Sequence, residues 1–456
     1  MTQSSDESQI DVEEAEHSLP LHVVERAIRF SYAQAMLSAI YVASTGGMFI
    51  IGYALKLGAN NAQIGLLSTV PMLCVVAQLI SSMVVERGYS RRSLSVLGSV
   101  LNVAGWLFII MLPVAGARLS AEFRIFALIG IIALVTVFAH LASNARASWI
   151  GDLIPPRRRG TFFGRAIMYA GIIGAMFAII EGLFLDRVKG MGMSAFSWLF
   201  VFGMAFGLAS ALLFVPQPDI PLRRNDSNSG FVKQVRQTFS NSALMVVVLY
   251  AILWSMQAIA APFYATYLLR DLKMPFVGVG IINAVATITA LTSSPFWGRI
   301  VDRYGCRPVL VLCTAIIIPM PLAWIWIRNA QTAYAIACPV NLLGGFVVAG
   351  ISVSLSTLIY KVIPAIGRSV QLAVYSIVVV LAVAPMPTIG GHLPDWLNSL
   401  GIGADIRCTF YVSAIFILLA TLMARRIHEP DAAHTGDMMR NLPDHLRRPE
   451  SLKPAK

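Results

Sequence analysis

The sequence predicts an all-α membrane protein with about twelve transmembrane helices in two similar six-helix bundles. Of its 456 residues, 57% are hydrophobic and only 13% are charged, which is far more apolar than a soluble globular protein. The charged residues gather between apolar runs of roughly 20 residues, each long enough to cross a bilayer as a helix. Two charged loops with the same order of residues, one in each half of the chain, indicate an internal repeat.

The predicted spans lie on either side of one long polar stretch. In the first half they cover residues 30–55, 63–85, 94–115, 125–150, 162–185 and 195–215. Residues 216–242 are rich in Pro, Asn, Ser, Arg and Lys and are predicted to form a linker. The second six spans cover residues 243–269, 276–297, 308–327, 332–359, 369–391 and 406–424. The predicted domains are an N-terminal tail (1–28), a first bundle (29–215), the linker, a second bundle (243–427) and a C-terminal tail (428–456).

The Lys and Arg residues fall mostly on one side of the membrane if the spans alternate. Loops on that side hold clusters such as Arg91–Arg92, Arg157–Arg159 and Arg425–Arg426, whereas the opposite loops hold scattered basic residues. Because basic loops remain in the cytoplasm, both termini are predicted to be cytoplasmic, in a multi-pass protein of the inner membrane. The net charge of +12 is explained by this topology, and no basic, water-exposed domain for nucleic acid is evident.

Two pairs of repeated motifs follow corresponding spans. Gly298–Pro308 contains Asp302, Arg303, Gly305 and Arg307, and its earlier counterpart, Ser82–Arg92, contains Glu86 and Arg87. After the fourth span of each half, Asp152–Pro155 with Arg159 is matched by Lys361–Pro364 with Arg368. These motifs, with six plus six spans, resemble the major facilitator superfamily of secondary transporters. The earlier loop departs from the family, which usually has Gly and Asp where Ser82 and Glu86 stand, and the fifth span lacks the Gly-Pro pair typical of drug/proton antiporters.

The resemblance implies two halves that rock around a central site. An acid at a cytoplasmic helix end can then bind the free N–H groups at the start of a helix in the opposite half, forming a latch. We expect Glu86 to meet the start of the eleventh span at Arg368, and Asp302 to meet the start of the fifth. The latch group is completed by Arg87, Arg146 as a partner of Glu86, Asp152, Arg159, Arg303 and Arg307. For Arg91, Arg92, Arg157 and Arg158 the favoured interpretation is topology alone.

Ionisable groups inside spans are functional candidates by default. Glu181 is the one carboxylate well inside a predicted span, and it is the first candidate for proton coupling, although it could instead extend toward the membrane interface. His140 is the second candidate because its side chain can titrate near neutral pH. A simple hydrogen bond within the bundle is the alternative for this histidine.

Polar neutral side chains on apolar spans indicate where a substrate could bind. In the family that this chain resembles, spans one, four, seven and ten line the cavity, which points to Gln257, Trp254 and Asn341 as substrate contacts. Hydrogen bonding between helices is the alternative role for each of them. The scarcity of fixed charge favours a neutral or amphipathic substrate.

The predicted function is secondary transport of a small solute across the membrane, with the proton as a candidate coupling ion. A non-transporting sensor on the same fold is the main alternative. A membrane-embedded transferase would need a cluster of acid/base or metal-binding groups, whereas His392 and Asp395 form only an isolated pair. The chain has no phosphate-binding Gly-rich loop ending in Lys and no paired Cys motif, so no cofactor or metal is expected. We expect the transporter to act as a monomer.

Overall fold

The computed structural model describes residues 20–219 except 117, residues 242–429 except 364–367, and residues 432, 433, 435, 436, 438 and 440. Within these residues the chain forms helices and turns, without a strand. Eleven helices are long and apolar enough to span a membrane, and the shorter apolar helix Cys408–Ala424 completes a set of twelve. The predicted fold class is therefore confirmed. Most of the two predicted tails and of the linker lies outside the described residues.

The first half contains six spans, some of them built from more than one helix. They are α2 (Leu21–Thr45) with α3 (Gly47–Leu57), α4 (Asn61–Leu73) with η1 (Cys74–Val76) and α5 (Ala77–Glu86), α6 (Arg91–Ala115), α7 (Ala121–Leu153), α8 (Pro156–Arg187), and α9 (Met193–Leu212), which the short η2 (Lys189–Met191) precedes. The first span breaks at Gly46, and Gly47 has a φ of 53°, a left-handed value that Gly adopts at little cost. α2 begins directly after Pro20, earlier than the predicted span.

The second half repeats this order with more interruptions by proline. Its spans are α11 (Ser242–Ser255) with η3 (Met256–Ile259), α12 (Ala261–Thr266) and η4 (Tyr267–Asp271), α13 (Phe276–Tyr304), α14 (Cys306–Ile317) with α15 (Pro319–Ala323) and η5 (Trp324–Trp326), α16 (Ala330–Val362), α17 (Arg368–Val383) with α18 (Met386–Ser399), and α19 (Cys408–Ala424). Breaks occur beside Pro262, Pro319 and Pro385. Proline lacks the N–H that a continuous helix requires, so these spans divide into shorter segments.

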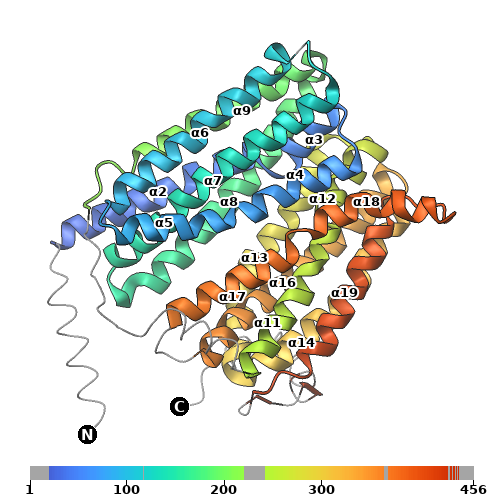
Figure 1. Ribbon diagram of the computed structural model, residues 1–456. Coiled ribbons are helices and arrows are strands. Elements are labelled where there is room, and N and C mark those ends of the chain that lie inside the picture. Colours follow the sequence, from blue (N-terminus) through green and yellow to red (C-terminus); the bar gives the residue numbers. More distant parts are fainter. Residues whose placement is uncertain are drawn as a thin grey trace, which may run out of the picture.

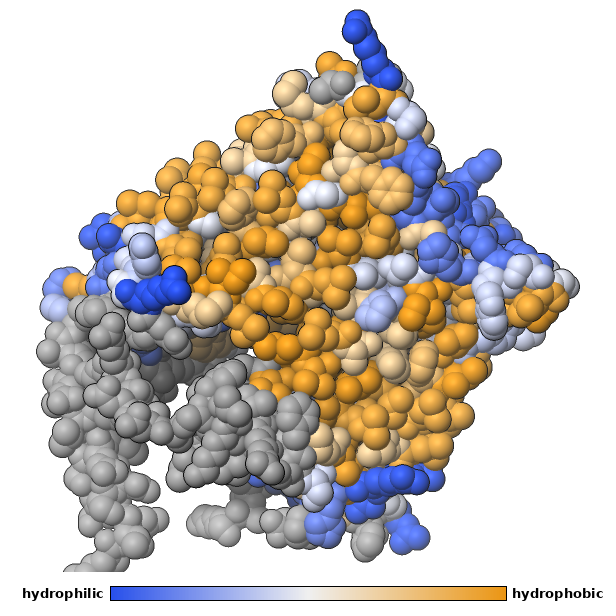
Figure 2. Space-filling view, in the orientation of Figure 1, coloured by the Kyte–Doolittle hydropathy of each residue, from blue (hydrophilic) through white to orange (hydrophobic). Residues whose placement is uncertain are grey.

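The two halves meet along one end of the bundle. In Figure 1 the halves approach one another near α3, α4, α12 and α18 and diverge toward α5 and α17. We call the end with loops 87–90, 154–155 and 305 the basic end, and the end with loops 58–60 and 272–275 the opposite end. Figure 2 shows a broad apolar belt with hydrophilic residues at its two ends. Such a belt matches the hydrocarbon core of a bilayer.

The buried apolar residues show where the halves are packed together. One core includes Phe49 and Phe196 from the first half and Phe263 and Phe410 from the second. A second core, around Trp297, lies within the second half alone. Because the shared core lies toward the opposite end, the halves are held together there.

Candidate functional site

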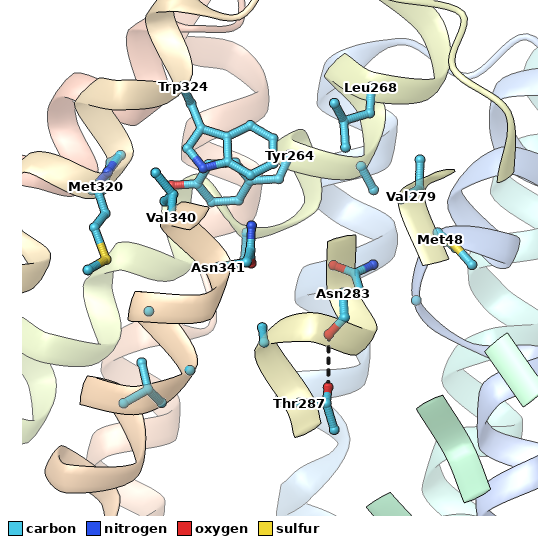
Figure 3. Close-up of a pocket in the computed structure, with 18 of the residues that line it drawn as sticks. Met48, Tyr264, Leu268, Val279, Asn283, Thr287, Met320, Trp324, Val340 and Asn341 are labelled. Atoms are coloured by element: carbon cyan, nitrogen blue, oxygen red, sulfur yellow. Dashed lines mark hydrogen bonds between the residues drawn. The ribbon is translucent and has the colours of Figure 1, made fainter. Parts of the chain in front are cut away.

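A cavity of about 540 Å³ lies between the two halves (Figure 3). One wall comes from α3 through Gly47, Met48 and Ile51. The other walls come from the seventh to tenth spans, through residues that include Gln257, Tyr264, Asn283, Thr287, Met320, Trp324 and Asn341. This volume is within the range of small-molecule sites. Among the described residues, none from the fourth span lines it.

Four neutral polar side chains face this cavity: Gln257, Asn283, Thr287 and Asn341. The Asn341 Nδ2 atom donates to the Ala337 carbonyl at 2.9 Å, and the Thr287 hydroxyl donates to the Asn283 carbonyl at 3.1 Å (Figure 3). Within the described chain, the side-chain amides of Gln257 and Asn283 have no hydrogen-bond partner. The cavity thus offers amide donors and acceptors that a solute can use.

Aromatic rings form the side of the cavity toward the opposite end. The Tyr264 ring lies 4.5 Å from the Trp324 ring and 4.6 Å from the Phe410 ring, centroid to centroid. Phe410 stacks on Tyr264 with an interplanar angle of 5° and holds it in place. The described lining contains no Asp, Glu, Lys, Arg or His. An uncharged solute with a flat apolar surface fits this chemistry, since a charge would enter without a counter-ion.

The three predicted substrate contacts differ in position. Gln257 and Asn341 line the cavity, whereas Trp254 is not part of its lining and packs on the core of the second half. Asn283 and Thr287 were not predicted as substrate contacts because they lie on the eighth span, outside the spans that the family resemblance implied. The sequence feature that could have identified Asn283 as a substrate contact is its polar side chain on an otherwise apolar helix.

An acid of the first half caps a helix of the second half at the opposite end. Asp186, at the end of α8, accepts the backbone N–H of Phe276 at 3.1 Å through Oδ1 and that of Val277 at 2.9 Å through Oδ2. These are the first residues of α13, so the carboxylate satisfies free N–H groups and faces the positive end of the helix dipole. Its side chain is only 12% exposed, with Lys189 at 3.4 Å. This is the type of contact that was predicted for the basic end.

Further contacts join the halves near the same end. The Arg270 Nη1 atom donates to Asn61 Oδ1 at 2.7 Å, and the hydroxyls of Thr69 and Thr388 are hydrogen-bonded at 2.8 Å. At Gly65 an added Cβ would lie 2.3 Å from the Pro387 carbonyl oxygen, so α4 and α18 can approach this closely only with glycine there. Among the described residues, the hydrogen bonds between the halves all lie in this region. We call this group of contacts the gate.

At the basic end, charged residues form networks within each half. Arg91 is 2% exposed, and its Nη1 atom lies 2.6 Å from Asp152 Oδ2. Next to it, the Ser90 hydroxyl donates to Asp219 at 2.5 Å. The interpretation of Arg91 as a topology residue alone is therefore wrong, because its side chain is buried in an ion pair between α6 and α7. Its partner is far away in sequence, so spacing gave no indication of this pair.

The second half has an equivalent network around Glu429. Glu429 Oε2 accepts the N–H groups of Cys306 at 2.9 Å and Arg307 at 2.8 Å, and its Oε1 accepts from Lys361 Nζ at 2.8 Å. Burial opposes ionisation of this carboxyl, but the hydrogen bonds from Lys361 and from the two N–H groups outweigh it and lower the pKa of Glu429. Arg307 also donates through Nη2 to the Arg425 carbonyl at 3.0 Å. Glu429, at the start of the predicted C-terminal tail, is thus bound to the loop motif Gly298–Pro308.

The other predicted latch residues form no contact between the halves among the described side chains. Arg87, Asp302 and Arg303 are exposed at the basic end. The Arg146 guanidinium lies 5.6 Å from the centroid of the Phe214 ring, within the first half. The side chains of Glu86, Arg159 and Arg368 lie outside the described part of the chain. Their role in a latch remains a prediction.

Both predicted proton-coupling residues are placed within the first half. Glu181 is 3% exposed, and its Oε1 atom accepts from the Ser44 hydroxyl at 2.5 Å. The two ring nitrogens of His140 lie 3.2 Å from Gln78 Nε2 and 3.4 Å from the Pro71 carbonyl oxygen. His140 therefore has partners that would hold it as a structural residue. The described residues contain no cluster of His, Cys, Asp and Glu that could hold a metal ion.

Twelve membrane-spanning helices whose two halves line a solute-sized cavity form the architecture of a secondary transporter. The model of the Major Facilitator Superfamily matches residues 32–266 and 244–449. The chain belongs to this superfamily.

One relative and several solved structures agree with this assignment. The chain is 26% identical over 284 residues to "Multidrug resistance protein MdtG" of Proteus mirabilis (strain HI4320). That match covers 60% of this chain and 65% of the relative, which is less than two thirds of its length. A point mutant of the nucleoside transporter NupG is similar in fold, with a TM-score of 0.71, 14% identity, and coverage of 88% of this chain and 100% of that one. A bacterial homologue of the iron transporter ferroportin, in an inward-facing state, has a TM-score of 0.66, 14% identity, and coverage of 90% and 99%.

Proposed function

We propose that this transporter works by alternating access around the central cavity and that its structure is the state open toward the basic end. The observation that supports this most strongly is the position of the hydrogen bonds between the halves. Those described lie at or near the opposite end, where α8 meets α13 and α4 meets α18. The helices diverge toward the basic end (Figure 1). Rocking of the two halves would open the opposite end and close the basic end.

The basic end faces the cytoplasm in this proposal. Its exposed basic residues include Arg87, Arg158, Arg303 and Arg425, and such loops are retained on the cytoplasmic side of a membrane. Both termini then lie in the cytoplasm, the membrane is the inner membrane, and the state is inward-facing. Residues from both halves of a single chain line the cavity, so a monomer would suffice for transport.

When the basic end closes, Glu86 and Asp302 would each accept N–H groups at the start of a helix in the other half. Asp186 makes this kind of contact at the opposite end in the present state. Asp302 is exposed in the present state and therefore available for such a contact. The two gates would then use the same chemistry in turn, a carboxylate against free N–H groups.

The substrate that the cavity supports best is an uncharged solute with a planar ring and several hydrogen-bonding groups. The ring would lie against Trp324 and Tyr264, and its polar groups would bind Asn283 and Asn341. Burial of a charged solute here would be opposed, because the described lining offers no counter-ion. The proton is the proposed coupling ion, with Glu181 as its first binding group and His140 as the second.

Thermal stabilisation of the purified protein tests the proposed substrate class. Uncharged ring compounds such as uridine, adenosine and chloramphenicol would be compared with charged partners such as uridine monophosphate. An uncharged ligand should raise Tm, and its phosphorylated partner should not. The shift should shrink in Asn341→Ala, because loss of one hydrogen bond weakens binding by about 0.5–1.5 kcal/mol. Stabilisation by the charged partner alone would contradict the assignment. If no ligand changes Tm, a sensor on the same fold would be favoured over a transporter.

A further inference from the structure

A pocket of about 400 Å³ lies between α2 and α8 at the basic end. The described linings of this pocket and of the central cavity share no residue. The polar part of its lining consists of Glu25, Arg29 and Tyr32 from α2 and Arg158, Thr161 and Arg165 from α8. Among these residues, three guanidinium groups are opposed by one carboxylate. This balance of charge favours a negatively charged ligand.

The hydrogen-bond donors of this pocket are not engaged with other parts of the protein. Among the described residues, the guanidinium groups of Arg29, Arg158 and Arg165 form neither an ion pair nor a hydrogen bond. The hydroxyls of Tyr32 and Thr161 likewise have no hydrogen-bond partner there. All five groups are therefore available to one anion. A guanidinium group that binds a phosphate or a carboxylate forms short, charge-assisted hydrogen bonds.

Aromatic packing fixes the two walls of the pocket relative to one another. The Tyr32 ring stacks on the Phe162 ring, with 5.2 Å between the centroids and an interplanar angle of 24°. It also meets the Tyr169 ring edge-on at 5.5 Å. Ring pairs in these geometries are favourable, and Phe162 is buried. The arginines of α2 and α8 therefore stand on a packed base that holds the pocket in shape.

Arg158 and Arg165 lie on the face of α8 that meets the lipid. At intervals of four or seven residues, which are one or two helical turns, the same face continues toward the opposite end. The residues at these positions are exposed and apolar: Ile172, Met176 and Leu183. Leu183 adjoins Gly182, where an added Cβ would lie 2.9 Å from the backbone of Phe276 in the other half. Because the halves touch there, the exposed Leu183 side chain faces lipid and not the space between the halves.

The length of α8 places the pocket at the depth of the lipid headgroups. α8 has 32 residues, which is about 48 Å at 1.5 Å per residue. The hydrocarbon core of a bilayer is about 30 Å thick and takes about 20 residues to cross. With the core ending near Asp186, Arg165 lies at its other boundary and Arg158 lies among the headgroups. A headgroup in the pocket would leave its acyl chains against Ile172 and Met176.

This combination of features selects an anionic lipid over other anions. Inorganic phosphate could bind the arginines, but it would not use the apolar face that continues from them. A zwitterionic lipid would bring a cationic group into a pocket in which arginines outnumber the carboxylate. Basic pockets between membrane helices on the cytoplasmic side are suited to anionic headgroups.

We propose that this pocket binds the headgroup of an anionic phospholipid of the cytoplasmic leaflet. The lipid phosphate binds Arg29, Arg158 and Arg165, and the hydroxyls of Tyr32 and Thr161 donate to its remaining oxygen atoms. Arg158 thereby has a role beyond topology. The leaflet rests on the orientation proposed above, whereas the site itself depends neither on that orientation nor on the solute in the central cavity.

Native mass spectrometry of the purified, delipidated full-length protein tests the proposal. The protein would be titrated with dioleoylphosphatidylglycerol or with dioleoylphosphatidylcholine, which has the same acyl chains and no net charge. Phosphatidylglycerol is expected to bind its tightest site at least about tenfold more strongly than phosphatidylcholine does. The double variant Arg158→Gln, Arg165→Gln should lose this preference. The double variant Arg425→Gln, Arg426→Gln removes the same charge from exposed positions at the same end, in the other half, and should keep the preference.

Glu25→Gln changes the affinity in the other direction. Removal of the carboxylate in the described lining should strengthen the binding of phosphatidylglycerol, because the carboxylate repels the lipid phosphate. A gain in affinity cannot result from misfolding. This variant therefore tests the site even if the double variant of Arg158 and Arg165 is not monodisperse in size-exclusion chromatography.

An unchanged preference for phosphatidylglycerol in the double variant of Arg158 and Arg165 would overturn the proposal. An equal loss in the double variant of Arg425 and Arg426 would show that the basic end attracts anionic lipid without a defined site, and would overturn it too. Displacement of the lipid by inorganic phosphate would make a free anion the occupant instead. Unchanged or weaker binding in Glu25→Gln would also refute the site.

Discussion

Removal of the Asp186 charge should weaken the gate at the opposite end. In Asp186→Asn the side chain keeps its shape, but the amide has one acceptor oxygen where the carboxylate uses two, for Phe276 and Val277. A charge at a partly buried helix N-terminus contributes up to about 2 kcal/mol. Hydrogen bonds to charged groups contribute about 1.5–3 kcal/mol. A loss of about 1–2 kcal/mol shifts the equilibrium between the two states by roughly 5- to 30-fold.

Distances between spin labels at the opposite end measure this shift. The labels would be attached to Glu122→Cys on α7 and Ser399→Cys on α18, which are exposed positions in different halves. The five native cysteines would first be replaced. In Asp186→Asn the population with longer label-to-label distances should increase, because the closed gate is disfavoured. Asp186→Glu retains the charge and should shift the equilibrium less.

Asp405→Asn is the matched control for this experiment. Asp405 lies at the same end, but it pairs with Arg407, at 2.6 Å, within the second half. Its removal should therefore leave the distances nearly unchanged. Identical distance distributions in Asp186→Asn and wild type would refute the gate, and an equal shift in Asp405→Asn would show that general charge, not the cap on α13, sets the equilibrium.

Three further predictions use other contacts. Gly65→Ala should lengthen the same label-to-label distances, since its Cβ would lie 2.3 Å from the Pro387 carbonyl oxygen and overpacking costs about 1–3 kcal/mol. Gly130→Ala is the control, because the space around Gly130 is open, and it should leave the distances unchanged. Equal effects of the two substitutions would contradict the close approach of α4 and α18. Because the pKa of Glu429 is lowered below its usual 4.5, its contribution to stability is present above that pH and is lost as the pH falls through the lowered value. Glu429→Gln should thus lower Tm at neutral pH and reduce the loss of Tm on acidification, whereas parallel Tm curves would exclude this role. Asp302→Asn should slow transport while expression stays normal, and an equal loss of folded protein would instead make Asp302 structural.

The fold could be predicted because apolar run length and loop charge are properties of the chain alone. The Gly46-Gly47 pair indicated a kink in the first span from the sequence alone, and the structure breaks there. The break beside Pro262 was harder to predict. Gln257 and Asn341 could be found because neutral amides are conspicuous on apolar helices.

The partners of the charged groups could not be predicted. Asp186 meets the start of α13 only because α8 packs against that helix. Arg91 and Asp152 are likewise brought together by the packing of α6 on α7. The sequence analysis predicted that a carboxylate of one half would bind N–H groups at the start of a helix in the other half. It could not predict at which end of the molecule this contact forms, because that depends on the conformational state.

Counterflow in proteoliposomes tests the central claim most directly. Vesicles would be loaded with the uncharged ligand that gives the largest rise in Tm, and uptake of the same ligand in radiolabelled form would be followed. Alternating access around the central cavity predicts saturable uptake that internal unlabelled ligand accelerates, and that is reduced in Asn341→Ala. Uptake that does not saturate, or that is indifferent to internal ligand and to Asn341→Ala, would contradict it.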